Sequence, residues 1–187
     1  MITTLRTGIL TFTLCTTAAM LAAPLAAQQR AGGTMPAPPT SVQAALANDV
    51  GTLSDKFTGL AKVMSGKYDW RPGAGVRSVS EVFNLIVSEN KMLTGLLTGA
   101  PAPGGGMNAP QITDPVQLQA ALTSSYAALK QAIAGLSASD LTANVKMFGM
   151  DMTKQGAALM LLMDQHEHLG QSIAYARTNG VVPPWSK

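Results

Sequence analysis

The sequence predicts an all-α protein built as a four-helix bundle. In four long stretches, apolar residues recur at spacings of three and four, which places them on one face of a helix. No stretch shows the alternation of apolar and polar residues that is typical of a half-buried strand. The chain is rich in Ala, Leu, Met and Gly, and only 5% of its residues are aromatic. Four amphipathic helices bury their apolar faces most simply against one another, as a bundle.

The beginning of the chain predicts export. Arg6 is the only charged residue before Arg30, and an apolar run between them ends in Ala26-Ala27. A basic start, a short apolar core and a small-residue end are typical of a secretory signal peptide, here residues 1–27. An uncleaved membrane anchor is the alternative, but the run is shorter than the ~20 residues that a membrane-spanning helix needs. We therefore expect a periplasmic or extracellular protein with no stable membrane span after cleavage.

The rest of the chain reads as a linker and one domain. Residues 28–40 are small and proline-rich, which predicts a flexible linker, and the bundle is expected over residues 41–187. The one cysteine, Cys15, lies in the signal peptide, so the mature protein would have no disulfide and no thiol ligand. Loss of Arg6 lowers the formal net charge of +3 by one. Because Lys and Arg form no cluster, we expect no nucleic-acid binding, which requires a basic stripe.

The first helix is expected over residues 42–65, with Ser41 as its N-cap. A loop follows at residues 67–78, where proline and glycine prevent a helix. Two large aromatic residues in this loop, Tyr68 and Trp70, are expected to fold back onto the bundle. The loop therefore reads as a packed connection rather than a binding loop.

The second helix is expected over residues 80–98, capped by Ser78 or Ser80. Ser78 followed three residues later by Glu81 fits a capping box. The apolar residues of this helix form one face, and Glu89 projects into the same arc. A carboxylate in a core-facing arc is costly unless it is paired or binds a metal. Glu89 is therefore a candidate functional residue.

A loop at residues 99–111 precedes the third helix, for which Thr113 is the expected cap and Asp114-Pro115 the first turn. The third helix ends near residue 136. Residues 137–151 are expected to be a connector, in which Phe148-Gly149-Met150 plugs one end of the bundle.

The last helix, residues 154–178, is expected to begin after Thr153 and to stop at Asn179-Gly180. Asp164 and His168 are spaced i, i+4, so they share a helix face and could both reach one cation. They are the strongest chemical signal in the sequence.

His166, the other histidine of the chain, belongs to a different face. Two residues along a helix correspond to a rotation that leaves His166 ~160° from His168. One ion bound from the bundle interior cannot easily take both. We expect His166 to be a surface or interface group.

Two groups of motifs stand out along the chain. They are Tyr68-Asp-Trp-Arg-Pro-Gly-Ala-Gly-Val-Arg-Ser78 with Glu81-Val-Phe-Asn-Leu-Ile-Val, and Glu167-His-Leu-Gly-Gln with Tyr175-Ala-Arg and Gly180-Val-Val-Pro-Pro184. In their order and spacing these motifs resemble the DinB-like family. The resemblance covers most of the chain after the linker, and it implies an up-down-down-up bundle, frequent homodimers and a divalent metal, usually zinc or nickel. In the family the metal is held by three histidines, one on the second helix and two on the last, and some members are metal-dependent thiol S-transferases.

The resemblance places only one histidine at a ligand position. His168 takes the second position on the last helix, Asp164 takes the first, and Leu85 takes the position on the second helix. Glu89 lies one turn from Leu85 on a similar face and is the expected substitute, with Glu81 one turn the other way. Glu89, Asp164 and His168 would suit zinc or manganese, and nickel is the other metal the family uses. Alternatively, Glu89 pairs with a neighbouring helix or a dimer seam, and Asp164 only accepts a hydrogen bond from His168.

Two functions stay open at this point. The first is an exported bundle with a degenerate divalent-metal site, weakly catalytic or non-catalytic, that acts as a homodimeric binding module. The second is a metal-dependent transferase or hydrolase, similar to the thiol S-transferases, that uses Asp164, His168 and a substitute third ligand. A bundle that binds a small apolar ligand between its helices is a weaker third reading. The sequence contains no nucleophile-elbow serine, and it identifies neither a substrate nor a small-molecule ligand.

Overall fold

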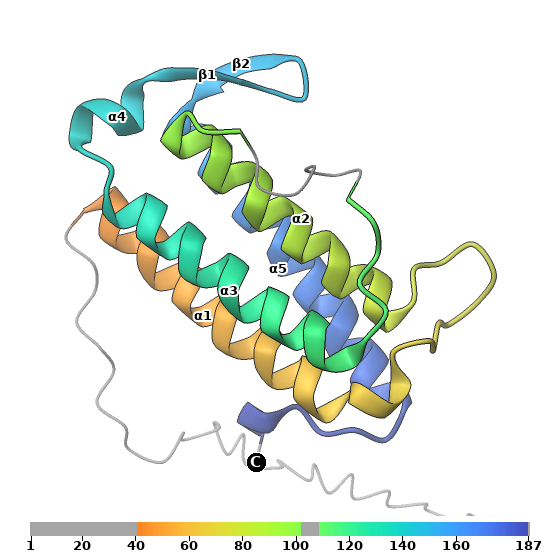
Figure 1. Ribbon diagram of the computed structural model, residues 1–187. Coiled ribbons are helices and arrows are strands. Elements are labelled where there is room, and N and C mark those ends of the chain that lie inside the picture. The colour runs from red at the N-terminus through yellow and green to blue at the C-terminus, as the bar shows by residue number, and fades with distance from the viewer. Residues whose placement is uncertain (1–40, 102–108, 187) are drawn as a thin grey trace, which may run out of the picture. The chain divides into compact units, whose positions relative to one another are not determined.

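A computed structural model describes residues 41–101 and 109–186, so the predicted signal peptide (1–27) and linker (28–40) lie outside the described residues. Four long helices dominate this part of the chain (Figure 1): α1 (Val42–Val63), α2 (Val79–Thr98), α3 (Pro115–Ala134) and α5 (Lys154–Thr178). The smaller elements are η1 (Ser65–Lys67), α4 (Ala138–Thr142), β1 (Asn144–Met147), β2 (Met150–Thr153) and η3 (Pro184–Ser186). The predicted all-α class is confirmed.

The four helices form the predicted up-down-down-up bundle. α1 packs against α3 and α5, and α2 packs against the same two helices, so α1 and α2 lie diagonally across the bundle. In Figure 1, α2 and α3 run together in one direction while α1 and α5 run in the other. The functional consequence is that α2 and α5 are antiparallel neighbours, so residues near the middle of each face one another.

An aromatic cluster fills the end of the bundle near the loop between α1 and α2. Phe57 stands edge-on to Phe83 with ring centroids 6.3 Å apart and stacks on Tyr126 at the same centroid distance. Tyr68 packs edge-on against Phe83 at 5.7 Å and donates its hydroxyl to the Ala61 carbonyl at 3.0 Å. These contacts confirm that Tyr68 folds back onto the bundle, as the sequence predicts.

The helix caps agree with the sequence at three of the four long helices. Ser41 accepts from the Ala44 amide, Ser78 and Glu81 form a complete capping box, and Thr153 accepts from the Gly156 amide. The third helix is the exception.

The expected Thr113 cap is wrong, because Asp114 is the N-cap and accepts from the Gln117 amide at 2.8 Å. Pro115 then occupies the first helical position, where its missing N–H costs nothing. A carboxylate is also the better cap here, since it faces the positive end of the helix dipole.

The connector before α5 holds a β-hairpin that the sequence reading missed. β1 and β2 are antiparallel and Met147 pairs with Met150, so the turn consists of Phe148 and Gly149 alone. Both turn residues have positive φ, 52° and 79°. Phe148 is 57% exposed, so the prediction that it plugs the bundle end is wrong. Strands of four residues are too short for a reliable alternation in the sequence.

Asn84 is buried although the helical periodicity of α2 places it opposite the apolar face of that helix. Its side chain accepts from the Ile112 amide at 2.7 Å while donating to the Ile112 carbonyl at 3.0 Å. These paired bonds dock the segment before α3 onto α2. The segment before α3 covers the Asn84 side chain that binds it. Helical periodicity within α2 cannot predict this burial, because the covering segment belongs to another part of the chain.

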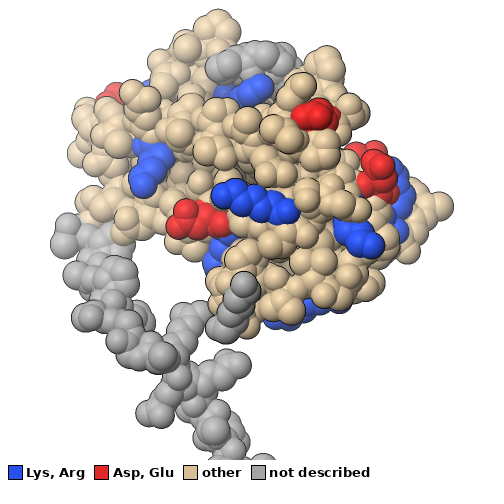
Figure 2. Space-filling model, turned by 60° about the horizontal axis from the view of Figure 1, so that its bottom comes forward, with Lys and Arg blue, Asp and Glu red and all other residues tan. Residues whose placement is uncertain are grey.

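The surface of the described domain carries few charges. In Figure 2, Lys and Arg side chains are scattered among Asp and Glu on a face that is mostly uncharged. Within residues 41–101 and 109–186, no helix has the length and hydropathy needed to cross a membrane.

Candidate metal centre

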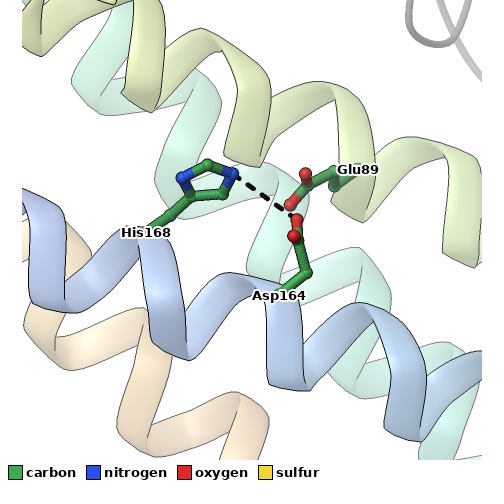
Figure 3. A group of neighbouring side chains, drawn as sticks. All are labelled: Glu89, Asp164 and His168. Carbon is green, nitrogen blue, oxygen red and sulfur yellow. Dashed lines mark ion pairs between the residues drawn. The ribbon is translucent and has the colours of Figure 1, made fainter.

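Glu89, Asp164 and His168 meet between α2 and α5. One ligand atom from each of the three side chains lies within 4.8 Å of the others, and His168 Nε2 is 3.5 Å from Asp164 Oδ2. Figure 3 shows the Glu89 carboxyl group descending from α2 toward the Asp164 carboxylate, with the His168 ring beside them. The i, i+4 spacing on α5 sets the Asp164–His168 pair, and antiparallel packing of α2 brings Glu89 to it. Asp164 and His168 therefore converge as the helix phase predicts, and the packing of α2 on α5 adds Glu89, the expected substitute ligand.

Glu89 is the buried member of the group. Its residue is 3% exposed, and its Oε2 atom has no hydrogen-bond partner in the described part of the chain. Burial raises the pKa of its carboxyl group to about 8, and the neighbouring Asp164 carboxylate adds to the effect, while Gln165 and the charge of Arg77 oppose it. In the metal-free protein Glu89 is therefore mainly protonated at neutral pH.

Hydrogen bonds behind His168 fix which of its nitrogens carries the proton. Tyr175 Oη lies 3.1 Å from the Arg77 carbonyl, which can only accept, so the hydroxyl donates there and accepts from Gln171 Nε2 at 2.9 Å. The amide oxygen of Gln171 then faces His168 Nδ1 at 3.1 Å, and Nδ1 must donate. In the neutral ring, Nε2 is left with a lone pair directed toward Asp164. This is the tautomer that a metal ligand needs.

A buried polar network supports the other side of the centre. Gln165, which is fully buried, donates to Asn90 Oδ1 at 2.9 Å and accepts from the Tyr126 hydroxyl at 3.1 Å. Asn90 in turn donates to Ser125 Oγ at 3.1 Å. The sequence reading missed this network. Its signal was the set of uncharged polar residues next to Glu89 and Asp164 on otherwise apolar helices.

His166 is directed away from the centre. Its Nε2 lies 2.8 Å from Asp49 Oδ1 on α1, so it ties α5 to α1 at the surface. The sequence prediction that His166 and His168 serve different faces is confirmed.

A cavity of about 380 Å³ opens over the three side chains. Leu85 lies in its wall, at the position where the resemblance places a histidine, and the tip of the β-hairpin contributes Phe148. The full set of lining residues is Arg77, Leu85, Glu89, Phe148, Met160, Leu161, Asp164 and His168.

The residues present fit a divalent cation. An orphaned carboxyl oxygen, a half-exposed carboxylate and an imidazole lone pair point at one place, and such oxygen and nitrogen donors suit zinc, manganese or nickel. Three protein ligands leave coordination positions for water or a ligand from the cavity. Structurally, the centre could therefore both hold a metal and expose it.

Comparisons with known proteins agree with the architecture. The sequence profile of the DinB superfamily matches residues 52–172. The crystal structure of a DinB-like protein from Bacillus cereus superposes with a TM-score of 0.63 at 19% identity, covering 74% of this chain and 93% of that one. One from Bacillus subtilis gives 0.60 at 14% identity with the same coverage. No curated protein gives a significant match. At these identities the two structures establish the fold.

Proposed function

The chain belongs to the DinB superfamily, and from that premise we propose that it binds one divalent metal ion through Glu89, Asp164 and His168. The observation that carries the proposal is the orphaned Oε2 of Glu89. Buried polar atoms are normally hydrogen-bonded, and a buried carboxyl oxygen left without a partner costs stability. A cation at this place would give that oxygen a partner.

The fixed tautomer of His168 supports the same assignment. Gln171 and Tyr175 hold the ring so that Nε2 can act as a ligand without reorientation. Metal-binding histidines are commonly held in this way by a partner on the second nitrogen.

We propose that the protein acts as a binding module with weak or no catalytic activity. Asp164 and Leu85 replace two of the three histidines that the family resemblance implies. The alternative is a metal-dependent transferase or hydrolase, and the open cavity over the centre favours it. A divalent metal held there would polarise a bound oxygen or activate a nucleophile. Turnover of a small thiol with an electrophilic aryl halide by the metal-loaded protein, lost in His168→Ala, would support this alternative.

The test of metal binding is a calorimetric titration of the chelator-treated protein with zinc, manganese and nickel. We expect one site per chain for at least one of these metals. Glu89→Gln and His168→Ala should each lose at least about tenfold in affinity, since even the loss of a residue that only supports a ligand costs that much. His166→Ala is the matched control, since it removes a histidine from the same helix outside the centre. If none of the three metals binds, the proposal is wrong.

We also propose a homodimer that uses an apolar stripe on α5. Leu159, Met160 and Met163 are exposed on one side of this helix, and the exposed Phe148 of the hairpin lines the same cavity as Met160. A contiguous exposed apolar patch on a soluble domain is typical of an interaction surface. Analytical ultracentrifugation should give a dimer for the wild type and a monomer for Met163→Glu.

Export is likewise a proposal, supported by the pattern of residues 1–27. Expression of the full chain in a bacterial host, followed by cell fractionation and mass spectrometry, tests it. We expect the protein in the periplasm or medium with a new N-terminus near residue 28. A full-length protein retained in the cytoplasm would contradict export.

A further inference from the structure

Arg77 stands between the candidate metal centre and a second cavity. Besides the cavity over the centre, Arg77 and Leu85 both line a second cavity of about 440 Å³. The two residues therefore form a shared wall. A ligand in either cavity would meet the guanidinium of Arg77.

The backbone of Arg77 is held by the same chain of bonds that orients His168. Its carbonyl accepts from Tyr175, which Gln171 joins to the histidine ring. Arg77 also immediately precedes Ser78, the cap of α2. The residue is thus fixed to both helices that supply the candidate metal ligands, so its side chain starts from a defined place beside them.

The guanidinium of Arg77 is available for a ligand. In the described part of the chain it forms no ion pair and no hydrogen bond, whereas Arg71 in the same loop is bound to Glu81 at 3.3 Å and to the Val76 carbonyl at 3.3 Å. Its charge nevertheless lies close enough to Glu89 to act on that carboxyl group. An unpaired arginine in a cavity wall is a ready binding group for a planar anion.

The charges of the loaded centre favour an anion with a single charge. A divalent cation would be balanced by the carboxylates of Glu89 and Asp164, and a histidine that binds a metal does so as the neutral ring. Arg77 then leaves one formal positive charge facing the cavity. A carboxylate matches this excess and the bidentate geometry of arginine, whereas a phosphate monoester would bring nearly two negative charges.

The rest of the cavity wall is apolar. Leu85, Phe148, Met160 and Leu161 supply it. Phe148 is the notable member, since it has φ 52° in a two-residue turn followed by Gly149 at 79°. Such turns favour Asn-Gly, and a bulky residue in the left-handed region is strained. A strained side chain that reaches a cavity points to a role there.

We propose that the cavity binds a small organic carboxylate carrying a short apolar group, with Arg77 holding the carboxylate and Phe148 packing against the apolar group. This inference rests on the proposed metal site, because without a cation the carboxylate of Asp164 would repel the ligand. The cavity of about 380 Å³ is large enough for such a molecule. Arg77 and Phe148 would then determine what reaches the metal.

The test uses 4-phenylbutyrate, its neutral analogue 4-phenylbutan-1-ol, and butyrate, each titrated into zinc-loaded protein after zinc uptake has been measured on the same sample. We expect 4-phenylbutyrate to bind about tenfold more tightly than either analogue. Arg77→Gln should remove the preference for the carboxylate over the alcohol. Arg71→Gln is the matched control and should change the affinity less than twofold, since Arg71 is already paired with Glu81. Phe148→Asn should remove the preference for 4-phenylbutyrate over butyrate.

The outcomes separate the two proposals. Three results would overturn this inference and leave the metal site standing, provided that zinc is taken up. They are equal affinity for the carboxylate and the alcohol, no binding of any probe, and full affinity for 4-phenylbutyrate in Arg77→Gln. Failure to take up any of zinc, manganese and nickel overturns both. If Arg77→Gln unfolds, Arg77→Lys tests the same point, because lysine keeps the charge but loses the bidentate contact. An unchanged preference for the carboxylate in a folded Arg77→Lys would show that charge alone suffices. That result would contradict the role given to the guanidinium.

Discussion

The buried carboxyl group of Glu89 lies beside the half-exposed carboxylate of Asp164, on two helices that run in opposite directions. Asp164 has 46% of its side chain exposed, whereas Glu89 is 3% exposed. Because Glu89 is so strongly buried, its carboxyl group keeps a proton at neutral pH. This asymmetry leads to the first two predictions.

Metal binding at neutral pH should release a proton from Glu89. The pKa of its carboxyl group is raised to about 8, and a metal ligand must be deprotonated. Calorimetric titration with zinc at pH 7 in buffers of different ionisation enthalpy should report close to one proton released per ion. Apparent affinity should rise with pH up to about 8 and then level off. Glu89→Gln should abolish the release, and a wild type that releases no proton would contradict the assignment.

Glu89 should also make the metal-free protein less stable as pH rises. The folded protein keeps this proton up to about pH 8, whereas the unfolded chain loses it near the ordinary glutamate pKa of 4.5. Between these values the folded state binds more protons, so stability falls with rising pH and levels off above 8. Each unit of raised pKa corresponds to about 1.4 kcal/mol.

The measurement is urea unfolding of the wild type and Glu89→Gln with a chelator present. The variant should be more stable than the wild type by roughly a few kcal/mol at pH 9, and this advantage should shrink toward pH 5. Glu167→Gln, on the exposed side of α5, should show no such trend. Parallel pH profiles for Glu89→Gln and the wild type would count against a buried, proton-binding Glu89.

The buried polar network should contribute more through its completeness than through any single bond. Tyr126→Phe removes one donor to Gln165 and should cost about 1 kcal/mol of unfolding free energy. Gln165→Leu leaves both Asn90 Oδ1 and the Tyr126 hydroxyl without partners and should cost about 2–5 kcal/mol. Chemical denaturation measures both. Equal costs for the two variants would mean that the network does not act as described.

His166 should be dispensable for metal binding and of little weight for stability. It pairs with Asp49 at 2.8 Å, but both side chains are partly exposed. Pairs of this kind contribute about 0–1 kcal/mol. His166→Ala should therefore retain the zinc affinity of the wild type and lose less than about 1 kcal/mol in unfolding free energy. A loss of metal binding in this variant would show that the face assigned to His166 is wrong.

The turn of the hairpin should become more stable when Phe148 is replaced by Asn. Phe148 and Gly149 have positive φ, which an Asn-Gly pair adopts at lower cost. We expect Phe148→Asn to raise the melting temperature, with a gain on the order of 1 kcal/mol. Phe148→Ala, which removes the ring but keeps the backbone strain, is the control. Lower stability in Phe148→Asn than in Phe148→Ala would contradict the backbone strain assigned to this turn.

Local features of the fold were predictable from the sequence. Ser41, Ser78 and Thr153 cap helices in the structure because capping depends on residues within one turn. The Asp164–His168 pair and the separation of His166 follow from helical rotation alone. Where two neighbouring residues could both cap, as at Thr113 and Asp114, sequence reasoning chose the wrong one.

The sequence by itself determined the bundle, the bounds of its long helices and the pair on α5, since helical periodicity and capping are properties of short stretches. Only the tertiary structure decided that Glu89 completes the group, that Asn84 docks a distant loop, and that Tyr175 and Arg77 set the tautomer of His168. Each of these relations joins residues that are far apart in the chain. Their distances depend on how α2 and α5 pack and on which polar atoms that packing removes from water, and neither quantity is encoded in any single helix.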